Sequence, residues 1–91
     1  MATSRTKVKI QSYTFKVVVE SDKFPDGRKA YHAYVPALQS CRTWGYTVPE
    51  ALKNLEEAAQ MIVKLMVERG EPIPQETEIQ DSPRITVNLA E

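Results

Sequence analysis

Acidic side chains in the first third of this chain are the residues whose spacing could support catalysis. Glu20, Asp22 and Asp26 lie close together in the sequence, and a two-metal nuclease needs several carboxylates around metal ions about 4 Å apart. Two of the three fall in or beside a predicted hairpin loop, and Asp26 is explained by the turn that an Asp-Gly pair forms. No later predicted strand supplies a further carboxylate. We therefore expect no enzymatic activity, and a metal-dependent nuclease remains the third hypothesis.

The single histidine and the single cysteine do not provide another reactive site. Zinc sites take several Cys or His ligands at regular spacings, so we expect no metal site. His32 lies in a predicted strand, where we expect a surface or hydrogen-bonded structural histidine. Cys41 is expected to be a small buried apolar residue. The sequence contains no phosphate-binding loop and no G-x-S-x-G motif, and we expect no cofactor.

The composition describes one small domain without an overall charge. The chain has 91 residues, and 12 Lys and Arg residues balance 12 Asp and Glu residues. No field therefore draws nucleic acid or an anionic membrane to the whole protein. No apolar run approaches the ~20 residues of a membrane span. A lone cysteine suits a reducing compartment, so we expect a cytoplasmic protein.

Apolar alternation and helical periodicity predict the elements of an α+β domain in the order βββαβ. Asp26-Gly27 predicts a tight turn that pairs the first two strands as an antiparallel hairpin. The predicted strands are residues 13–20, 29–35, 41–44 and 84–89, and the predicted helix is residues 48–69. Residues 1–12 are polar and basic and are expected to be flexible, whereas residues 13–91 are expected to form the single domain.

The start of the helix has the strongest local signals of the chain. Thr47 is a good N-cap and Glu50 follows three residues later, as in a capping box. The hydroxyl of Thr47 can accept from the N–H of Glu50, and the Glu50 carboxylate can accept from the N–H of Thr47. Pro49 falls in the first turn, where its missing N–H costs nothing. Gly70 is well placed to end the helix.

One helix covers only one face of a sheet. The other face must therefore contact water, a second copy of this chain or a partner. The expected buried stripe of the helix is Leu52, Leu55, Ala59, Ile62 and Met66, widened by Ala51, Ala58 and Leu65. Alternation places Val18, His32, Tyr34, Arg42 and Trp44 on the uncovered face, where aromatic residues and arginine favour a partner surface. A shift of one residue would exchange Tyr34 for Tyr31. Two interpretations of Tyr34 and Trp44 therefore stay open: core residues, or exposed anchors.

Four different short motifs follow one another along the chain. They are Asp26-Gly27, Tyr34-Val35-Pro36-Ala37-Leu38-Gln39-Ser40-Cys41, Gly45-Tyr46-Thr47-Val48-Pro49-Glu50-Ala51-Leu52 and Gly70-Glu71-Pro72-Ile73-Pro74. Together they resemble the HicB family, the antitoxins of HicA toxins. That family has Asp-Gly, a Tyr-containing strand, a Pro-Asp-Leu-Pro-Gly-Cys-like segment, Gly-x-Thr-x-x-Glu-Ala and often Gly-x-x-Ile-Pro. Ala37, Gln39 and Ser40 depart from the family's Asp, Pro and Gly, so the turn before Cys41 is expected to differ.

The resemblance implies a partial ribonuclease-H-like βββαβ fold that lacks the nuclease carboxylates. It also implies a protein that binds a small mRNA-cleaving HicA toxin and masks its active site, and that self-associates. Family members often carry a C-terminal DNA-binding domain. Only one strand-like segment follows Pro83 here, so we expect no such domain and no direct operator binding. The alternative is an orphan homo-oligomeric module with a regulatory or ligand-binding role and no toxin.

Overall fold

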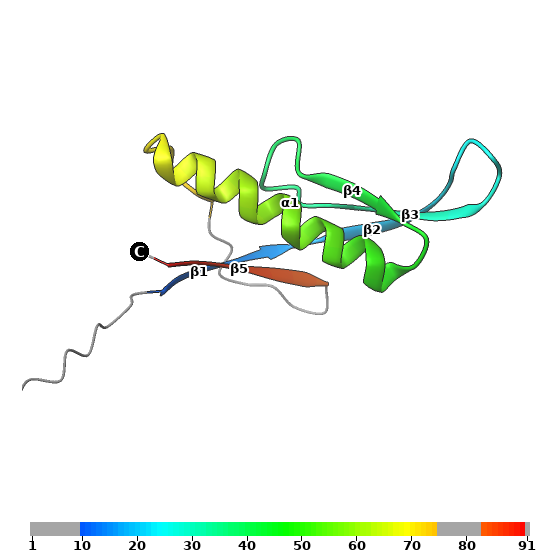
Figure 1. The fold of residues 1–91 in the computed structure, drawn as a ribbon, viewed down its shortest axis with the longest axis horizontal. Helices are drawn as coiled ribbons and strands as arrows, with labels where there is room; N and C mark the ends of the chain where they lie inside the picture. The colour runs from blue at the N-terminus through cyan, green and yellow to red at the C-terminus, as the bar shows by residue number, and fades with distance from the viewer. Residues whose placement is uncertain (1–9, 75–82, 91) are drawn as a thin grey trace, which may run out of the picture.

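Five strands and one helix form the protein, which is described by a computed structural model over residues 10–74 and 83–90. The elements are β1 (Ile10–Lys16), β2 (Val18–Lys23), β3 (Lys29–Tyr34), β4 (Arg42–Gly45), α1 (Val48–Glu68) and β5 (Arg84–Ala90). β1 pairs with β5 in one antiparallel sheet, and β2, β3 and β4 form a second antiparallel sheet in that order. Figure 1 shows α1 lying along one side of both sheets. None of the described residues forms a helix long and apolar enough to span a membrane.

The strand predicted for residues 13–20 is two strands, so the first strand of the predicted order βββαβ is divided at Val17. β1 ends at Lys16, β2 begins at Val18, and the two pair with different partners. Between them, the N–H of Val17 donates to the carbonyl of Pro83 at 2.9 Å. Phe15 and Val17 are both buried, so the apolar alternation runs through the junction unchanged. Alternation reports which face is buried, and it carries no information about which strand lies alongside.

β1 also begins earlier than the predicted domain boundary at residue 13. Ile10 pairs with Ala90, and the Ser12 hydroxyl donates to the Asn88 side chain at 2.7 Å. The flexible segment predicted for residues 1–12 was therefore wrong for its last three residues, which are in a strand. Residues 1–9 lie outside the described part of the chain.

The hairpin predicted at Asp26-Gly27 is confirmed. β2 and β3 pair antiparallel from Val18↔Tyr34 to Lys23↔Lys29. Gly27 has a φ of 88°, a value that L side chains rarely adopt, and its N–H donates to the carbonyl of Phe24 at 2.8 Å. This turn fixes the register of the two strands, and the register decides which side chains share a face.

The turn before Cys41 keeps the backbone conformation that a glycine would favour. Ser40 has a φ of 67° and is the non-glycine residue with a positive φ among the described residues. It occupies the position where the resembled motif has Gly. The N–H of Cys41 donates to the carbonyl of Leu38 at 3.3 Å, and the N–H of Val35 to the carbonyl of Cys41 at 3.0 Å. The turn therefore closes around Ser40, at a cost in steric strain.

Replacing Ser40 with glycine is expected to stabilise the protein. A left-handed conformation costs an L-residue roughly 1–2 kcal/mol, and part of this gain is lost because glycine makes the unfolded chain more flexible. Ser40→Gly should therefore raise the free energy of unfolding by about 0.5–1 kcal/mol in urea titration. The neighbouring exposed Gln39, whose φ is not positive, provides the control. Gln39→Gly should lower stability, and a loss of stability in both variants would contradict the argument.

The helix follows the prediction at both ends. Thr47 is the N-cap, and its hydroxyl accepts from the N–H of Glu50 at 3.2 Å. Among the described residues, no hydrogen bond joins the N–H of Thr47 to the Glu50 carboxylate. Only half of the capping box therefore forms. At the other end, the N–H of Gly70 donates to Val67 and that of Glu71 donates to Met66, with Gly70 at a φ of 70°. This pair of bonds is a Schellman motif.

Removing the Thr47 hydroxyl should destabilise the protein measurably. An N-cap Thr→Ala change typically costs about 1 kcal/mol, which corresponds to a fall in Tm of about 4–8 °C for a domain of this size. Thr47→Ala is therefore expected to show this fall in a thermal melt followed by circular dichroism. Thr47→Ser keeps the accepting oxygen and should stay near the wild type. Equal melting of both variants and the wild type would show that the cap contributes nothing.

The buried face of α1 is rotated slightly from the predicted stripe. Its fully buried residues are Ala51, Leu55, Ala59 and Val63, one per turn at a spacing of four. Leu52, Ala58, Ile62 and Met66 pack beside them and are partly buried. Leu65, predicted in the stripe, is 47 % exposed, and Val63 was missed. Apolar residues surround much of this helix, so periodicity alone did not fix its rotation.

The core lies between α1 and the sheets. Its sheet side consists of Phe15, Val17, Ala33, Val35, Ile85 and Val87, with Leu38 and Cys41 from the connection. Cys41 is a free buried cysteine, as predicted. Burial raises the pKa of its thiol from the ordinary value of 9.0 to about 11, because an apolar environment disfavours the thiolate. Cys41 is therefore a packing residue and a poor nucleophile.

The raised pKa of Cys41 predicts how stability depends on pH. The folded state keeps the thiol neutral, so the free energy of unfolding should fall as pH rises from about 9, where the unfolded thiol ionises, towards about 11. At pH 8, a maleimide should modify Cys41 slowly in the folded protein and fast in urea. Cys41→Ser should remove this thiol-dependent loss of stability. Fast modification of the folded protein at pH 8 would contradict the assignment.

Candidate functional site

The five residues predicted as a partner surface lie on one face of the β2–β3–β4 sheet. Paired residues on neighbouring strands point to the same side, and the register aligns Val18, Tyr34 and Arg42 in one row. The next row on this side aligns Glu20, His32 and Trp44. Tyr31, Ala33 and Val35 point to the opposite side, where they join or pack against the core. We call the side that carries Val18, His32, Tyr34, Arg42 and Trp44 the outer face.

Three aromatic rings contact one another along the outer face. The rings of His32 and Trp44 are nearly parallel, with centroids 4.5 Å apart and an interplanar angle of 16°. The rings of His32 and Tyr34 are tilted by 32°, with centroids 5.2 Å apart. Trp44 is 43 % exposed, so of the two interpretations left open by the sequence, the structure supports exposure rather than a place in the core. Stacking holds these rings in fixed positions before any partner arrives.

The indole of Trp44 reaches across β3 to the acidic strand. Its Nε1–H donates to a carboxylate oxygen of Asp22 on β2 at 3.3 Å, although Trp44 is on β4. Ala30, the β3 residue that pairs with Asp22, is fully buried. Hydrogen bonds from the Lys23 backbone and from Trp44 hold the pKa of Asp22 below its ordinary value of 3.8. The carboxylate is therefore ionised at neutral pH.

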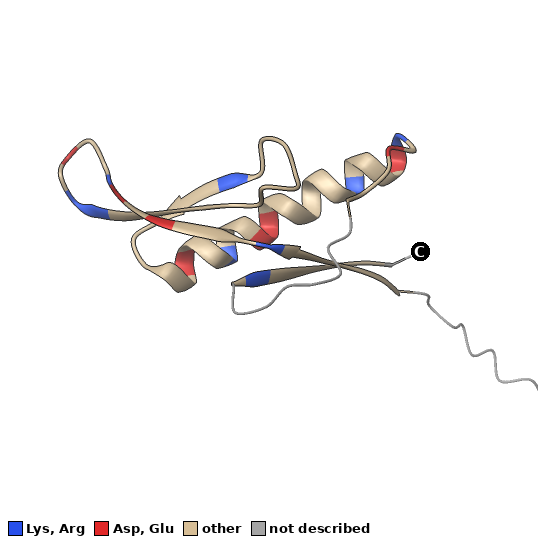
Figure 2. Ribbon diagram, turned by 180° about the vertical axis from the view of Figure 1, so that it is seen from behind, with Lys and Arg blue, Asp and Glu red and all other residues tan. Residues whose placement is uncertain are grey.

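Glu20 and Arg42 act in opposite directions on the hydroxyl of Tyr34. A hydrogen bond to the Glu20 carboxylate is the main cause of a raised pKa of Tyr34, and burial adds to it. The positive charge of Arg42 opposes the shift. The outer face thus carries carboxylates along β2, aromatic rings along β3 and β4, and a guanidinium at one end. Figure 2 shows the acidic and basic positions that follow one another along the β2–β3 hairpin.

His32 leaves one polar atom without a partner. Its Nε2 is buried and has no hydrogen-bond partner in the part of the chain that the structure describes. An unsatisfied buried polar group costs about 1–3 kcal/mol, and such groups in native proteins call for an explanation. The sequence predicted a surface or hydrogen-bonded histidine, whereas His32 is partly buried between two rings. The neighbouring rings cover this nitrogen without providing a donor or an acceptor.

The three acidic residues first considered for catalysis do not converge. Asp26 accepts from the Arg28 side chain at 2.7 Å in the exposed turn, while Asp22 bonds Trp44 and Glu20 bonds Tyr34. Among the described residues, no group of three His, Cys, Asp or Glu side chains is placed to hold a metal ion. Each of the three carboxylates has a separate local partner.

The corner between β4 and α1 positions Trp44. Gly45 is buried, and a Cβ at this position would lie 2.6 Å from the backbone nitrogen of Ala51. The Thr43 hydroxyl donates to the carbonyl of Ala51, and the Asn54 amide donates to the carbonyl of Trp44, both at 3.1 Å. The predicted cap at Thr47 and Glu50 belongs to this corner. There the N–H of Glu50 donates to the Thr47 hydroxyl at the start of α1.

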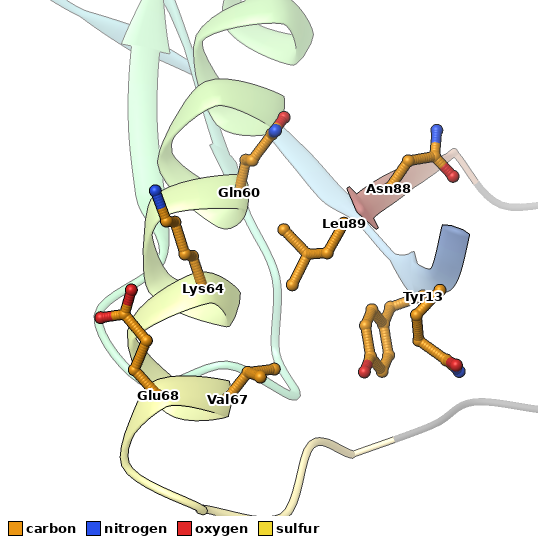
Figure 3. Close-up of a pocket in the computed structure, with 8 residues that line it drawn as sticks. Tyr13, Gln60, Lys64, Val67, Glu68, Asn88 and Leu89 are labelled. Atoms are coloured by element: carbon orange, nitrogen blue, oxygen red, sulfur yellow. The ribbon is translucent and has the colours of Figure 1, made fainter. Parts of the chain in front are cut away.

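Sequence reasoning missed a groove between α1 and the β1–β5 sheet. It encloses about 400 Å³ and is shown in Figure 3. Its lining comes from three elements: Gln11 and Tyr13 of β1, Gln60, Lys64, Val67 and Glu68 of α1, and Asn88 and Leu89 of β5. These segments are far apart in the sequence, so no local signal could predict the groove. The mixed lining contains no constellation of catalytic or metal-binding residues.

Comparison with known proteins connects this geometry to a family. The model of the HicB-like antitoxins of bacterial toxin-antitoxin systems matches residues 15–85. The chain belongs to the HicB-like antitoxin family. This match includes β2, β3 and β4 with the outer face, the corner at Gly45 and the whole of α1.

Two further comparisons found similar proteins. The UPF0150 protein ssr1765 of Synechocystis sp. is 33 % identical over 66 residues, which cover 72 % of this chain and 78 % of that protein. The crystal structure of the N-terminal domain of the Burkholderia pseudomallei antitoxin HicB superposes with a TM-score of 0.60 at 24 % identity. That match covers 84 % of this chain and 96 % of the other. It confirms the α+β fold of this HicB-like protein, with antiparallel sheets and one helix.

Proposed function

We propose that this HicB-like antitoxin binds a small mRNA-cleaving toxin of the HicA type and masks its active site with the outer face. The observation that carries the proposal is the cluster of Tyr34, His32 and the exposed Trp44 on the outer face of a member of an antitoxin family. Rigid aromatic residues and arginine are enriched among the residues that dominate protein interfaces. Masking needs a complementary surface and no catalytic group, so neutralisation proceeds by occupancy in the cytoplasm.

Co-expression with the product of the neighbouring gene tests this proposal. The toxin alone should arrest growth, and the antitoxin should restore growth and co-purify with the tagged toxin. A stable complex buries about 1,200–2,000 Å² in total, so the pair should survive gel filtration. If growth is not restored and the two proteins do not co-purify, the proposal is wrong.

Self-association is the second proposal, and it uses a different surface. Met61 and Leu65 lie one helical turn apart on α1 and are 68 % and 47 % exposed. Glu57, Lys64 and Glu68 flank them with charges of both signs, so an antiparallel second copy could match opposite charges around the two apolar residues.

Light scattering tests self-association. The wild type should form a dimer or a higher oligomer, and Met61→Gln with Leu65→Gln should be monomeric. The alternative of an orphan module predicts the same oligomer without any toxin partner. A monomeric wild type at micromolar concentration would reject the self-association proposal and leave the toxin-binding proposal unaffected.

A further inference from the structure

The two carboxylates of β2 lie beside the aromatic stack on the outer face. Glu20 and Asp22 are alternate residues of one strand, so both point to this face. Arg42 is the basic residue of the three-stranded sheet on this face, and it belongs to the other row, with Val18 and Tyr34. Alternation directs Lys23 and Lys29 to the opposite side. Beyond the strands, the guanidinium of Arg28 over Tyr46 is paired with Asp26, so Glu20 and Asp22 leave the end of the outer face around Trp44 negative.

The exposed ring of Trp44 completes a site for a planar cation. His32 stacks on one face of the indole, and Trp44 as a whole remains 43 % exposed to solvent. A guanidinium binds over a tryptophan face within about 6 Å of the ring centroid, and it donates hydrogen bonds in its own plane. A carboxylate has about four acceptor positions. Asp22 uses two hydrogen bonds, with Lys23 and Trp44, and can accept more.

From this geometry we infer that Trp44, Asp22 and Glu20 form a receptor for an arginine side chain of a basic protein partner. The inference rests on the proposed function, because it specifies which chemical group of the partner the outer face binds. The charge of the site favours a cation, and the flat indole favours arginine over the compact ammonium of lysine. Arg42, at the other end of the face, opposes a bound cation by repulsion.

A titration with an arginine peptide tests the site without a toxin. Trp44 is the only tryptophan of the chain, so its fluorescence reports directly on the site. Tetra-arginine at low salt should give a saturable change in this fluorescence, and tetra-citrulline, which keeps the shape without the charge, should give none. Equal binding of the two peptides would overturn the inference.

Four substitutions separate the proposed site from general charge attraction. Glu20→Gln and Asp22→Asn should each weaken tetra-arginine binding at least fivefold. Arg42→Gln should strengthen it, because a repelling charge is lost. Glu57→Gln makes the same charge change on α1, away from the outer face, and should leave affinity within twofold of the wild type. Equal weakening by Glu57→Gln would show a non-specific field and reject the site.

Toxin binding then distinguishes this inference from the proposed function. If the wild type and the Glu20→Gln, Asp22→Asn double variant co-purify equally with the neighbouring gene product, the arginine receptor is wrong and the antitoxin function stands. If the wild type does not co-purify with that product, the antitoxin function falls, and the peptide titration decides the receptor on its own. If the double variant stays folded and loses only its binding to the toxin, the result supports both the antitoxin function and the arginine receptor.

Discussion

Among the Gly→Ala substitutions possible in this chain, Gly45→Ala is expected to destabilise the protein most. The new Cβ would lie 2.6 Å from the nitrogen and 3.0 Å from the Cα of Ala51. Both atoms belong to the backbone of α1, so no side chain can rotate away, and the helix must move off β4. Overpacking costs typically 1–3 kcal/mol, and we expect about 3 kcal/mol at this rigid contact.

Gly27→Ala provides the control for Gly45→Ala. Gly27 has open space around its Cβ position but a φ of 88°, so alanine there suffers backbone strain of roughly 1–2 kcal/mol. Urea unfolding of both variants compares steric collision with backbone strain. The Gly45 variant should unfold at the lower urea concentration, and its Trp44 fluorescence should shift because β4 moves. A smaller loss at Gly45 than at Gly27 would contradict the close approach.

Trp44→Ala is expected to cause the largest loss of toxin binding. The indole contributes exposed aromatic area, stacks on His32 and bonds Asp22, so its removal deletes an anchor and frees its neighbours. Interface residues of this kind typically cost 2 kcal/mol or more when truncated, which is a loss of affinity of roughly 30-fold or more. The affinity for the toxin can be measured by calorimetry, with growth rescue as a second readout.

Tyr46→Ala is the matched control for Trp44. Tyr46 is another exposed aromatic residue, 50 % exposed, and it packs on Phe24 at the hairpin end instead of joining the outer-face stack. Its removal should leave toxin affinity near the wild-type value. Circular dichroism must show that both variants remain folded. If the two substitutions weaken binding equally, the aromatic stack is not the anchor of the interface.

Local signals predicted most of the elements, and each has a short-range cause. The Asp26-Gly27 turn selects a hairpin, and the hairpin fixes the register that places His32 and Tyr34 on the outer face. Thr47 and Gly70 mark the helix ends because each supplies backbone bonds that the helix cannot make for itself. The motifs around these residues also indicated the family to which the chain belongs.

Features that depend on contacts between distant segments could not be predicted from the sequence. The break at Val17 depends on where Pro83 lies, and the exposure of Leu65 depends on how α1 is rotated over the sheets. Both are set by packing between segments far apart along the chain, and the apolar pattern is compatible with more than one answer. The bond from Trp44 to Asp22 across β3 is a further case, since strand alternation predicts a shared face but not which side chains meet.

The hairpin, the capped helix, the family and the residues of the outer face could be predicted from local patterns alone, because turns, caps and alternation act over a few residues. Only the tertiary structure decided that Gly45 must lack a side chain, through its contact with Ala51. It also decided that His32 lies between two rings with one nitrogen unsatisfied. Such contacts depend on distances between elements, which a pattern of residue types does not contain.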